Sequence, residues 1–308
     1  MGIGERVQRL LENPCRTVKV ELAIELDNGN LVLVGGINRR SQADNTLEVF
    51  APGAGTPTWF GPMSTGRIKP AIAHLDDGRV LITGGLDNTI PARAAAATSI
   101  EIFDPNDGSI TYAGDLNVGR FGHSATTLSD GRVVIIGGQT QAMGEDPVPA
   151  VAVEIYDPGA GQVISLEVTS FPRWEHTATL LPGDQVLLLG GYGEDGPRAD
   201  GEVFAGQALV PLNVTFPFGL IDHSATSVTA DDTFKVLIIG GTDGEAVHNA
   251  VWWMTPSATP GTVTVDNGTA LLEGRYGHRT VVLEDETILV LGGASEPYDP
   301  EAGPVAAR

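Results

Sequence analysis

The stretch Asp130-Gly131-Arg132-Val133-Val134-Ile135-Ile136-Gly137-Gly138 decides the fold, because variants of it recur along the chain. It joins a turn signal to a four-residue apolar run and ends in a glycine doublet. Short β-branched runs bounded by turn residues are typical of buried strands. A doublet after such a strand indicates backbone conformations or close approaches that a Cβ atom would forbid.

The doublet recurs six times, at intervals of 49, 53, 53, 50 and 52 residues. Self-similarity at such a period predicts a repeat architecture. Twelve of the 40 glycines belong to the doublets, so the glycine excess indicates structural punctuation and not flexible linkers. The doublets are Gly35-Gly36, Gly84-Gly85, Gly137-Gly138, Gly190-Gly191, Gly240-Gly241 and Gly292-Gly293.

Each repeat contains four segments with strand character. The first alternates and carries small residues, as at 123–128, and a hairpin turn leads into the apolar run. The third carries a glutamate, as in Glu154-Ile155-Tyr156-Asp157-Pro158, and a fourth follows near Ile164. Four antiparallel strands in each repeat predict a propeller blade. We therefore expect an all-β, six-bladed β-propeller that forms one domain over residues 1–308.

The repeat order closely resembles a known family. Gly-Arg-x-x-His, an apolar strand, Asp-Gly-Arg, a second apolar strand, Gly-Gly, a loop and Glu-Ile-Tyr-Asp-Pro together resemble the kelch repeat, most of all its bacterial type. The resemblance runs from about residue 18 to residue 300. It departs at the fourth strand, where kelch repeats usually carry a tryptophan and only Trp59 clearly supplies one.

The chain ends predict how the ring closes. The last repeat stops after its third strand at Pro300, while residues 5–11 precede the first inner strand. We expect this N-terminal segment to add to the last blade as its outermost strand. Closure of this kind protects the sheet edge.

Histidines recur at the start of the first strand, in four of the six repeats. A ring of imidazoles that binds a metal is one interpretation. A bond from each ring to the backbone or a carboxylate of a neighbouring blade is favoured, because one residue per blade does not form a compact ligand set. These residues are His123, His176, His223 and His278.

Arginines recur three residues before the histidine position. They can form bidentate pairs with the third-strand glutamates, or a crown that binds acidic sugars or carboxylate peptides. Repetition favours the pairs. The arginines are Arg67, Arg120, Arg173 and Arg275, and the glutamates are Glu48, Glu101, Glu154, Glu202 and Glu296.

The residue after each arginine varies and is often aromatic. The resemblance implies that this neighbourhood faces the same propeller end as the variable loops after the doublets, where a partner binds; packing inside the channel mouth is the alternative. Acidic loops at 192–196 and 242–245 lack the spacing of a calcium loop and predict solvated turns. The candidate binding residues are Arg67, Arg120, Phe121, Arg173, Trp174, Tyr192, Arg275 and Tyr276.

Composition excludes several classes of protein. The 18 basic and 39 acidic residues give a net charge of −21, which disfavours nucleic acid and anionic membranes. No apolar run is long enough to cross a bilayer. A lone Cys15 permits no internal disulfide and no cysteine metal cluster. Residues 1–20 lack the apolar segment of a signal peptide, which leaves two locations open: secreted or periplasmic if a leader was removed, and otherwise cytoplasmic.

Motifs of the common enzyme classes are missing from the sequence. We expect a non-catalytic binding or scaffold module, monomeric and without a cofactor or metal, that recognises a protein or glycan partner. The alternative is a carbohydrate-active propeller, similar to a sialic acid mutarotase or a lectin, that uses the arginines and carboxylates at the channel mouth. A galactose oxidase-like centre is disfavoured, because Cys15 lies outside any predicted channel loop.

Overall fold

The computed structural model describes residues 18–19, 22–90, 94–140, 146–166, 171–230, 233–283 and 285–296. The described elements are β-strands, and none of the described segments is a helix suited to crossing a membrane. The chain divides into two compact units, Arg9–Trp174 and Glu175–Arg308. Cys15 and the predicted closing strand at residues 5–11 lie outside the described residues.

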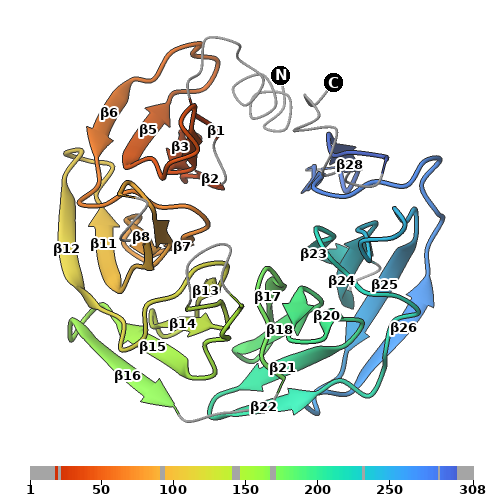
Figure 1. The fold of residues 1–308 in the computed structure, drawn as a ribbon. Coiled ribbons are helices and arrows are strands. Elements are labelled where there is room, and N and C mark those ends of the chain that lie inside the picture. Colours follow the sequence, from red (N-terminus) through yellow and green to blue (C-terminus); the bar gives the residue numbers. More distant parts are fainter. Residues whose placement is uncertain are drawn as a thin grey trace. The chain divides into compact units, whose positions relative to one another are not determined.

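The first unit contains three antiparallel four-stranded sheets, each formed in chain order (Figure 1). Two short strand pairs accompany them: β1 (Val18–Lys19) with β4 (Ile37–Asn38), and β9 (Leu86–Asp87) with β10 (Ala95–Ala96). The sheets are β2 (Leu22–Glu25), β3 (Leu31–Val34), β5 (Thr46–Phe50) and β6 (Trp59–Pro62); β7 (Ala71–His74), β8 (Val80–Thr83), β11 (Ser99–Phe103) and β12 (Ile110–Asp115); and β13 (Ser124–Thr127), β14 (Val133–Ile136), β15 (Val153–Asp157) and β16 (Gln162–Leu166).

Among its described residues, the second unit contains two more such sheets and a two-stranded hairpin from the sixth repeat. The short strands β19 (Tyr192–Gly193) and β20 (Gly196–Pro197) also pair with each other. The prediction of an all-β fold with antiparallel four-stranded sheets is thus confirmed. The larger sheets are β17 (Thr177–Leu181), β18 (Gln185–Leu189), β21 (Gly201–Ala205) and β22 (Ala208–Pro211), then β23 (Ser224–Ala230), β24 (Thr233–Ile239), β25 (Val251–Pro256) and β26 (Val263–Asn267); the hairpin joins β27 (Arg279–Val282) to β28 (Ile288–Leu291).

Strand β8 is apolar on both faces because each face packs on a different neighbouring sheet. In β8, Val80 and Ile82 pack with Val32 of the first sheet. The residue between them, Leu81, packs on the other side with Val133 of the third sheet. Such a strand has no solvent-facing side, so it appears in the sequence as an uninterrupted apolar run.

The glycine doublets lie where one repeat meets the next. All twelve doublet glycines have a positive φ, between +57° and +117°, so the predicted backbone requirement is confirmed. A Cβ atom on Gly84 would lie 2.3 Å from the carbonyl oxygen of Arg120. The N–H of Gly85 donates to that same oxygen at 2.9 Å, and Gly36 donates to Arg67 in the same way. The doublet therefore joins neighbouring sheets through their backbones.

Candidate functional site

Two of the repeated arginines form buried ion pairs with third-strand glutamates. Arg67 Nη2 lies 2.6 Å from Glu101 Oε2, and Arg120 Nη2 lies 2.5 Å from Glu154 Oε1. Burial lowers the pKa of both arginines, and the bond and charge of each glutamate oppose that shift. The predicted pairing is confirmed for these two repeats.

The same arginines also bind the backbone of their own sheets. Arg120 Nη1 donates to the carbonyl oxygens of Gly137 at 3.1 Å and Ala152 at 3.0 Å. Arg67 Nη1 makes the corresponding bond to Gly84. Both side chains are fully buried, and these contacts hold their guanidinium groups inside the fold. Neither side chain can therefore reach a ligand at the surface.

The remaining arginines occupy less uniform environments. Arg173 is buried, like Arg67 and Arg120. Arg275 is only partly buried and donates to the carbonyl oxygen of Gly292 at 3.2 Å, the bond that Arg120 makes to Gly137. Within the described part of the chain no ion pair joins Arg275 to Glu296, which is exposed. The predicted pair is therefore not formed in the sixth repeat.

The repeated histidines connect neighbouring sheets. His123 Nε2 lies 2.8 Å from the hydroxyl of Thr83, His223 Nε2 lies 2.9 Å from that of Thr177, and His278 Nε2 lies 2.9 Å from that of Ser224. The favoured structural role is seen in these three, and their Nε2 atoms bond side-chain hydroxyls, a partner that the prediction did not include. Burial lowers the pKa of His223 and of His278 to about 4, so both rings are neutral near pH 7.

The aromatic residues after the arginines lie mostly inside the protein. Phe121 and Trp174 are buried, and Tyr276 is partly buried. Phe121 forms a β-bridge with Gln139, and Tyr276 forms one with Ala294, the residue that directly follows its doublet. Phe121 and Trp174 are therefore packing residues, which was the alternative interpretation of this position.

Tyr192 lies in the second unit beside two carboxylates that the sequence interpretation missed. Burial raises the pKa of its phenol, and the charges of Glu175 and Asp222 raise it further. Both acidic residues have a positive φ, at +56° and +49°. In the sixth repeat the same position holds a glycine, Gly277. The change from glycine to an acidic residue at a position with positive φ is a sequence signal that could have identified Glu175 and Asp222.

The acidic loop at 242–245 is organised by its own contacts. Asp243 Oδ1 accepts the backbone N–H groups of Glu245 and Ala246, and Asp243 Oδ2 lies 3.0 Å from His248 Nε2. The side chain of His248 also stacks on Phe218, with ring centroids 3.4 Å apart. The Asp243 carboxylate therefore stabilises the turn itself, which agrees with the predicted solvated turn.

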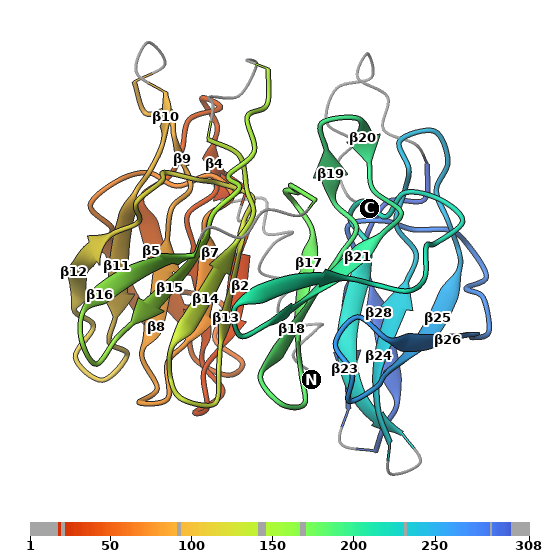
Figure 2. The same cartoon turned by 90° about the horizontal axis from the view of Figure 1, so that it is seen from below.

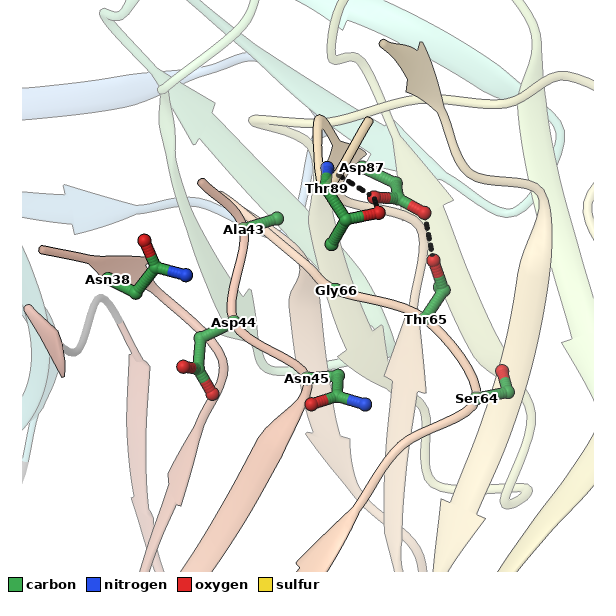
Figure 3. Close-up of a pocket in the computed structure, with 9 residues that line it drawn as sticks. All are labelled: Asn38, Ala43, Asp44, Asn45, Ser64, Thr65, Gly66, Asp87 and Thr89. Atoms are coloured by element: carbon green, nitrogen blue, oxygen red, sulfur yellow. Dashed lines mark hydrogen bonds between the residues drawn. The ribbon is translucent and has the colours of Figure 1, made fainter. Parts of the chain in front are cut away.

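A polar cleft opens in the first unit between the loops of its first two sheets (Figure 3). Its volume is about 360 Å³. The sequence interpretation missed this site, because its residues come from separate loops that meet only in the folded unit. Its lining residues are Asn38, Ala43, Asp44, Asn45, Ser64, Thr65, Gly66, Asp87 and Thr89.

Comparison by sequence finds distant relatives, and no family model matches the chain. A galactose oxidase of Gibberella zeae is 26% identical over 253 residues, which cover 73% of this chain and 34% of that protein. Kelch domain-containing protein 9 of Mus musculus is 29% identical over 150 residues, which cover 46% of this chain and 41% of that protein. The chain thus spans less than half the length of either relative.

Solved structures include two with a similar fold. A fungal alcohol oxidase of the AA5 family in complex with copper gives a TM-score of 0.68 at 18% identity, over 94% of this chain and 66% of that chain. The structure of YjhT gives a TM-score of 0.67 at 16% identity, over 93% of each chain. Likeness at such low identity shows the fold alone.

The copper in that oxidase structure calls for a test of the residues here. Among the residues that the structure describes, no group of three His, Cys, Asp or Glu side chains is arranged to hold a metal ion.

Three findings agree on the fold. Six glycine doublets end apolar strands, five antiparallel four-stranded sheets follow the repeat, and the similar proteins include a kelch-domain protein and a galactose oxidase. Together these findings support a kelch-type β-propeller.

Proposed function

We propose that the chain is a non-catalytic binding module that presents the loops at one end of its sheets to a protein or glycan partner. The observation that carries this proposal is the contrast between the repeat residues and the loops. Arg67 and Arg120 are buried against glutamates, and His123 is bonded to a hydroxyl. The loops, which typically carry function on a rigid scaffold, present exposed polar and apolar groups instead.

The loop end of the first unit offers both kinds of contact. Figure 2 shows β4, β9 and β10 beyond one end of the four-stranded sheets of this unit. Ile90 and Val148, on the loops after the second and third doublets, are 56% and 44% exposed. Exposed aliphatic side chains on loops suit a recognition surface, and Ile90 directly follows the cleft residue Thr89.

The proposal includes a complete ring. Six blades, with residues 5–11 added to the last sheet, would form one domain without an open sheet edge. The six doublets support the blade number, and the β27–β28 hairpin supports the need for further strands in the last blade. We propose that this ring acts as a monomer, without nucleic acid, membrane insertion or a cofactor.

A carbohydrate-active propeller is the second candidate. Tyr192 beside Glu175 and Asp222 supports it, since these groups can exchange protons with a sugar. The predicted use of Arg67 and Arg120 on a sugar carboxylate is not supported, because both arginines are bonded to glutamates. If this candidate is correct, the protein will accelerate the interconversion of sugar anomers followed by NMR, and Glu175→Gln will slow it.

Binding to a glycan array and to partner proteins captured from the source cell tests the leading proposal. Ile90→Asp and Val148→Asp should reduce binding to any partner that is found. Phe60→Ser is the matched control, because Phe60 is a 60% exposed apolar residue on the outer strand β6 of the same unit. Equal loss in the control and in the loop variants would contradict the proposed surface.

A further inference from the structure

We propose that the polar cleft of the first unit binds neighbouring hydroxyl groups of an uncharged sugar. This inference rests on the proposed function, because it names a ligand class for the loop end of that unit. Four features carry it: a cleft with fixed walls, a mixture of donors and acceptors at its surface, two carboxylates in its lining, and a suitable volume.

The walls of the cleft are fixed by hydrogen bonds between the loops of two sheets. Gln42 Nε2 donates to the carbonyl oxygen of Thr89 at 2.8 Å. Asn88 Nδ2 donates to the carbonyl oxygen of Ser41 at 3.1 Å, and Asn88 Oδ1 accepts the N–H of Ala43 at 2.5 Å. Walls held in place before binding reduce the entropy lost when a ligand binds.

Gly66 allows the two loops to approach each other at the cleft. A Cβ atom there would lie 2.8 Å from the carbonyl oxygen of Ala43 and 2.9 Å from the Thr89 methyl carbon. Any larger residue would push the loops apart. The cleft therefore depends on a close approach that the sequence provides for at this position.

The lining side chains keep polar atoms that the described parts of the protein leave unused. Asn38 Oδ1 accepts the N–H groups of Arg40 and Gln42, which leaves its Nδ2 as a donor. Asp44 Oδ1 accepts the N–H of Thr46 at 2.7 Å, which leaves Oδ2 as an acceptor. Asn45 uses its Nδ2 on a backbone carbonyl and leaves Oδ1.

A donor close to two acceptors matches the chemistry of a sugar. Each sugar hydroxyl can donate one hydrogen bond and accept others, so a pair of hydroxyls can satisfy both kinds of group. Figure 3 shows Asn38, Asp44 and Asn45 along one side of the cleft, and Thr65, Asp87 and Thr89 along the other.

Charge determines which sugars are suitable. Asp44 and Asp87 both line the cleft, and the nearby Arg67 is bonded to Glu101. Burial raises the pKa of Asp87, but hydrogen bonds from Thr65 and Thr89 outweigh it, so the pKa is lowered and the carboxylate is charged. An acidic sugar or a phosphate would meet two negative charges, whereas a neutral sugar would not.

Size and metal chemistry favour the same ligand. A volume of about 360 Å³ lies near the lower end of the range for small-molecule sites, roughly 300–1,000 Å³. A calcium ion takes six to eight oxygen ligands, usually with several carboxylates, and this cleft offers only Asp44 and Asp87. The cleft therefore suits a small neutral polyol better than a metal ion.

Titration of the full chain with galactose, glucose and mannose, followed by saturation-transfer NMR, tests this inference. Sialic acid and calcium chloride alone are the charged probes. At least one neutral sugar should bind, and Asp44→Asn or Asn38→Ala should weaken that binding about tenfold. Asp107→Asn is the matched control, because Asp107 also accepts the N–H two residues ahead, in an exposed turn, and should leave binding unchanged.

Four results would overturn the inference: no binding of any neutral sugar, equal affinity in Asp44→Asn, tighter binding of sialic acid, or binding of calcium alone. A loss of sugar binding counts as support only if each cleft variant keeps the melting temperature of the wild type. Suppose that another partner binds, that Ile90→Asp weakens this binding, and that the cleft variants bind the partner normally. In that case only the sugar inference fails, and the proposed binding function stands. If nothing binds the loop end, the proposed function fails as well.

Discussion

Glu154→Gln removes one charge from the buried pair with Arg120 and should destabilise the protein strongly. Both side chains are fully buried, and Glu154 also accepts the N–H of Asn117 at 2.7 Å. Removing one partner of a buried ion pair costs about 3–5 kcal/mol, because the other charge stays behind unpaired. Glutamine fills the same space, so we expect a loss of about 3 kcal/mol, which corresponds to a fall of roughly 5 °C in melting temperature for a chain of 308 residues.

The control is an exposed pair in the same sheet. Arg132 Nη2 lies 2.7 Å from Asp130 Oδ2, and their side chains are 40% and 46% exposed. Asp130→Asn should cost less than about 1 kcal/mol, because solvent screens the pair. The double variant Arg120→Met with Glu154→Leu should recover only part of the lost stability, since no buried charge remains but the backbone partners of both side chains lose their hydrogen bonds. If Glu154→Gln and Asp130→Asn melt within a degree or two of each other, the pair does not organise the blade.

Three further predictions follow from the packing. Burial lowers the pKa of His223 and His278 to about 4, so the free energy of unfolding should fall as the pH drops from about 6.5 toward 4. In melting curves recorded across this pH range, His223→Gln should reduce the fall. An unchanged dependence on pH would contradict the role of His223. Gly84→Ala adds a steric clash to the strain of a positive φ, so it should lower the free energy of unfolding by about 3 kcal/mol, measured with denaturant. Gly53 also has a positive φ, but a Cβ atom there would have no atom within 4 Å, so Gly53→Ala should cost only about 1 kcal/mol. Equal costs would refute the close approach at Gly84. Deletion of residues 1–14 should lower the melting temperature sharply if they close the ring, and unchanged melting would contradict closure.

The repeat made much of the fold predictable. A doublet such as Gly84-Gly85 recurs at nearly constant spacing, so its strand, its turn and its backbone conformation could be inferred together. The pair between Arg120 and Glu154 could be inferred as well, because both residues hold fixed places within one repeat. Contacts inside a repeat are set by local spacing, which the sequence displays directly.

Contacts between repeats were harder to predict. The partner of His123 is the hydroxyl of Thr83 in the preceding sheet, and the packing of one sheet on another determines that choice. The cleft was missed for the same reason, since Asn38, Ser64 and Asp87 come from three loops that meet only in the folded unit. Burial of Phe121 was likewise hidden, because a variable aromatic residue suits a binding surface and a packed interior equally well.

Hydrogen–deuterium exchange with and without a bound partner tests the central claim most directly. If the loop end of the first unit is the recognition surface, partner binding will slow exchange in residues 37–45, 64–66 and 86–89. Exchange in the outer strands β6, β12 and β16 should stay the same. Slower exchange confined to those outer strands, with the loops unaffected, would contradict the account.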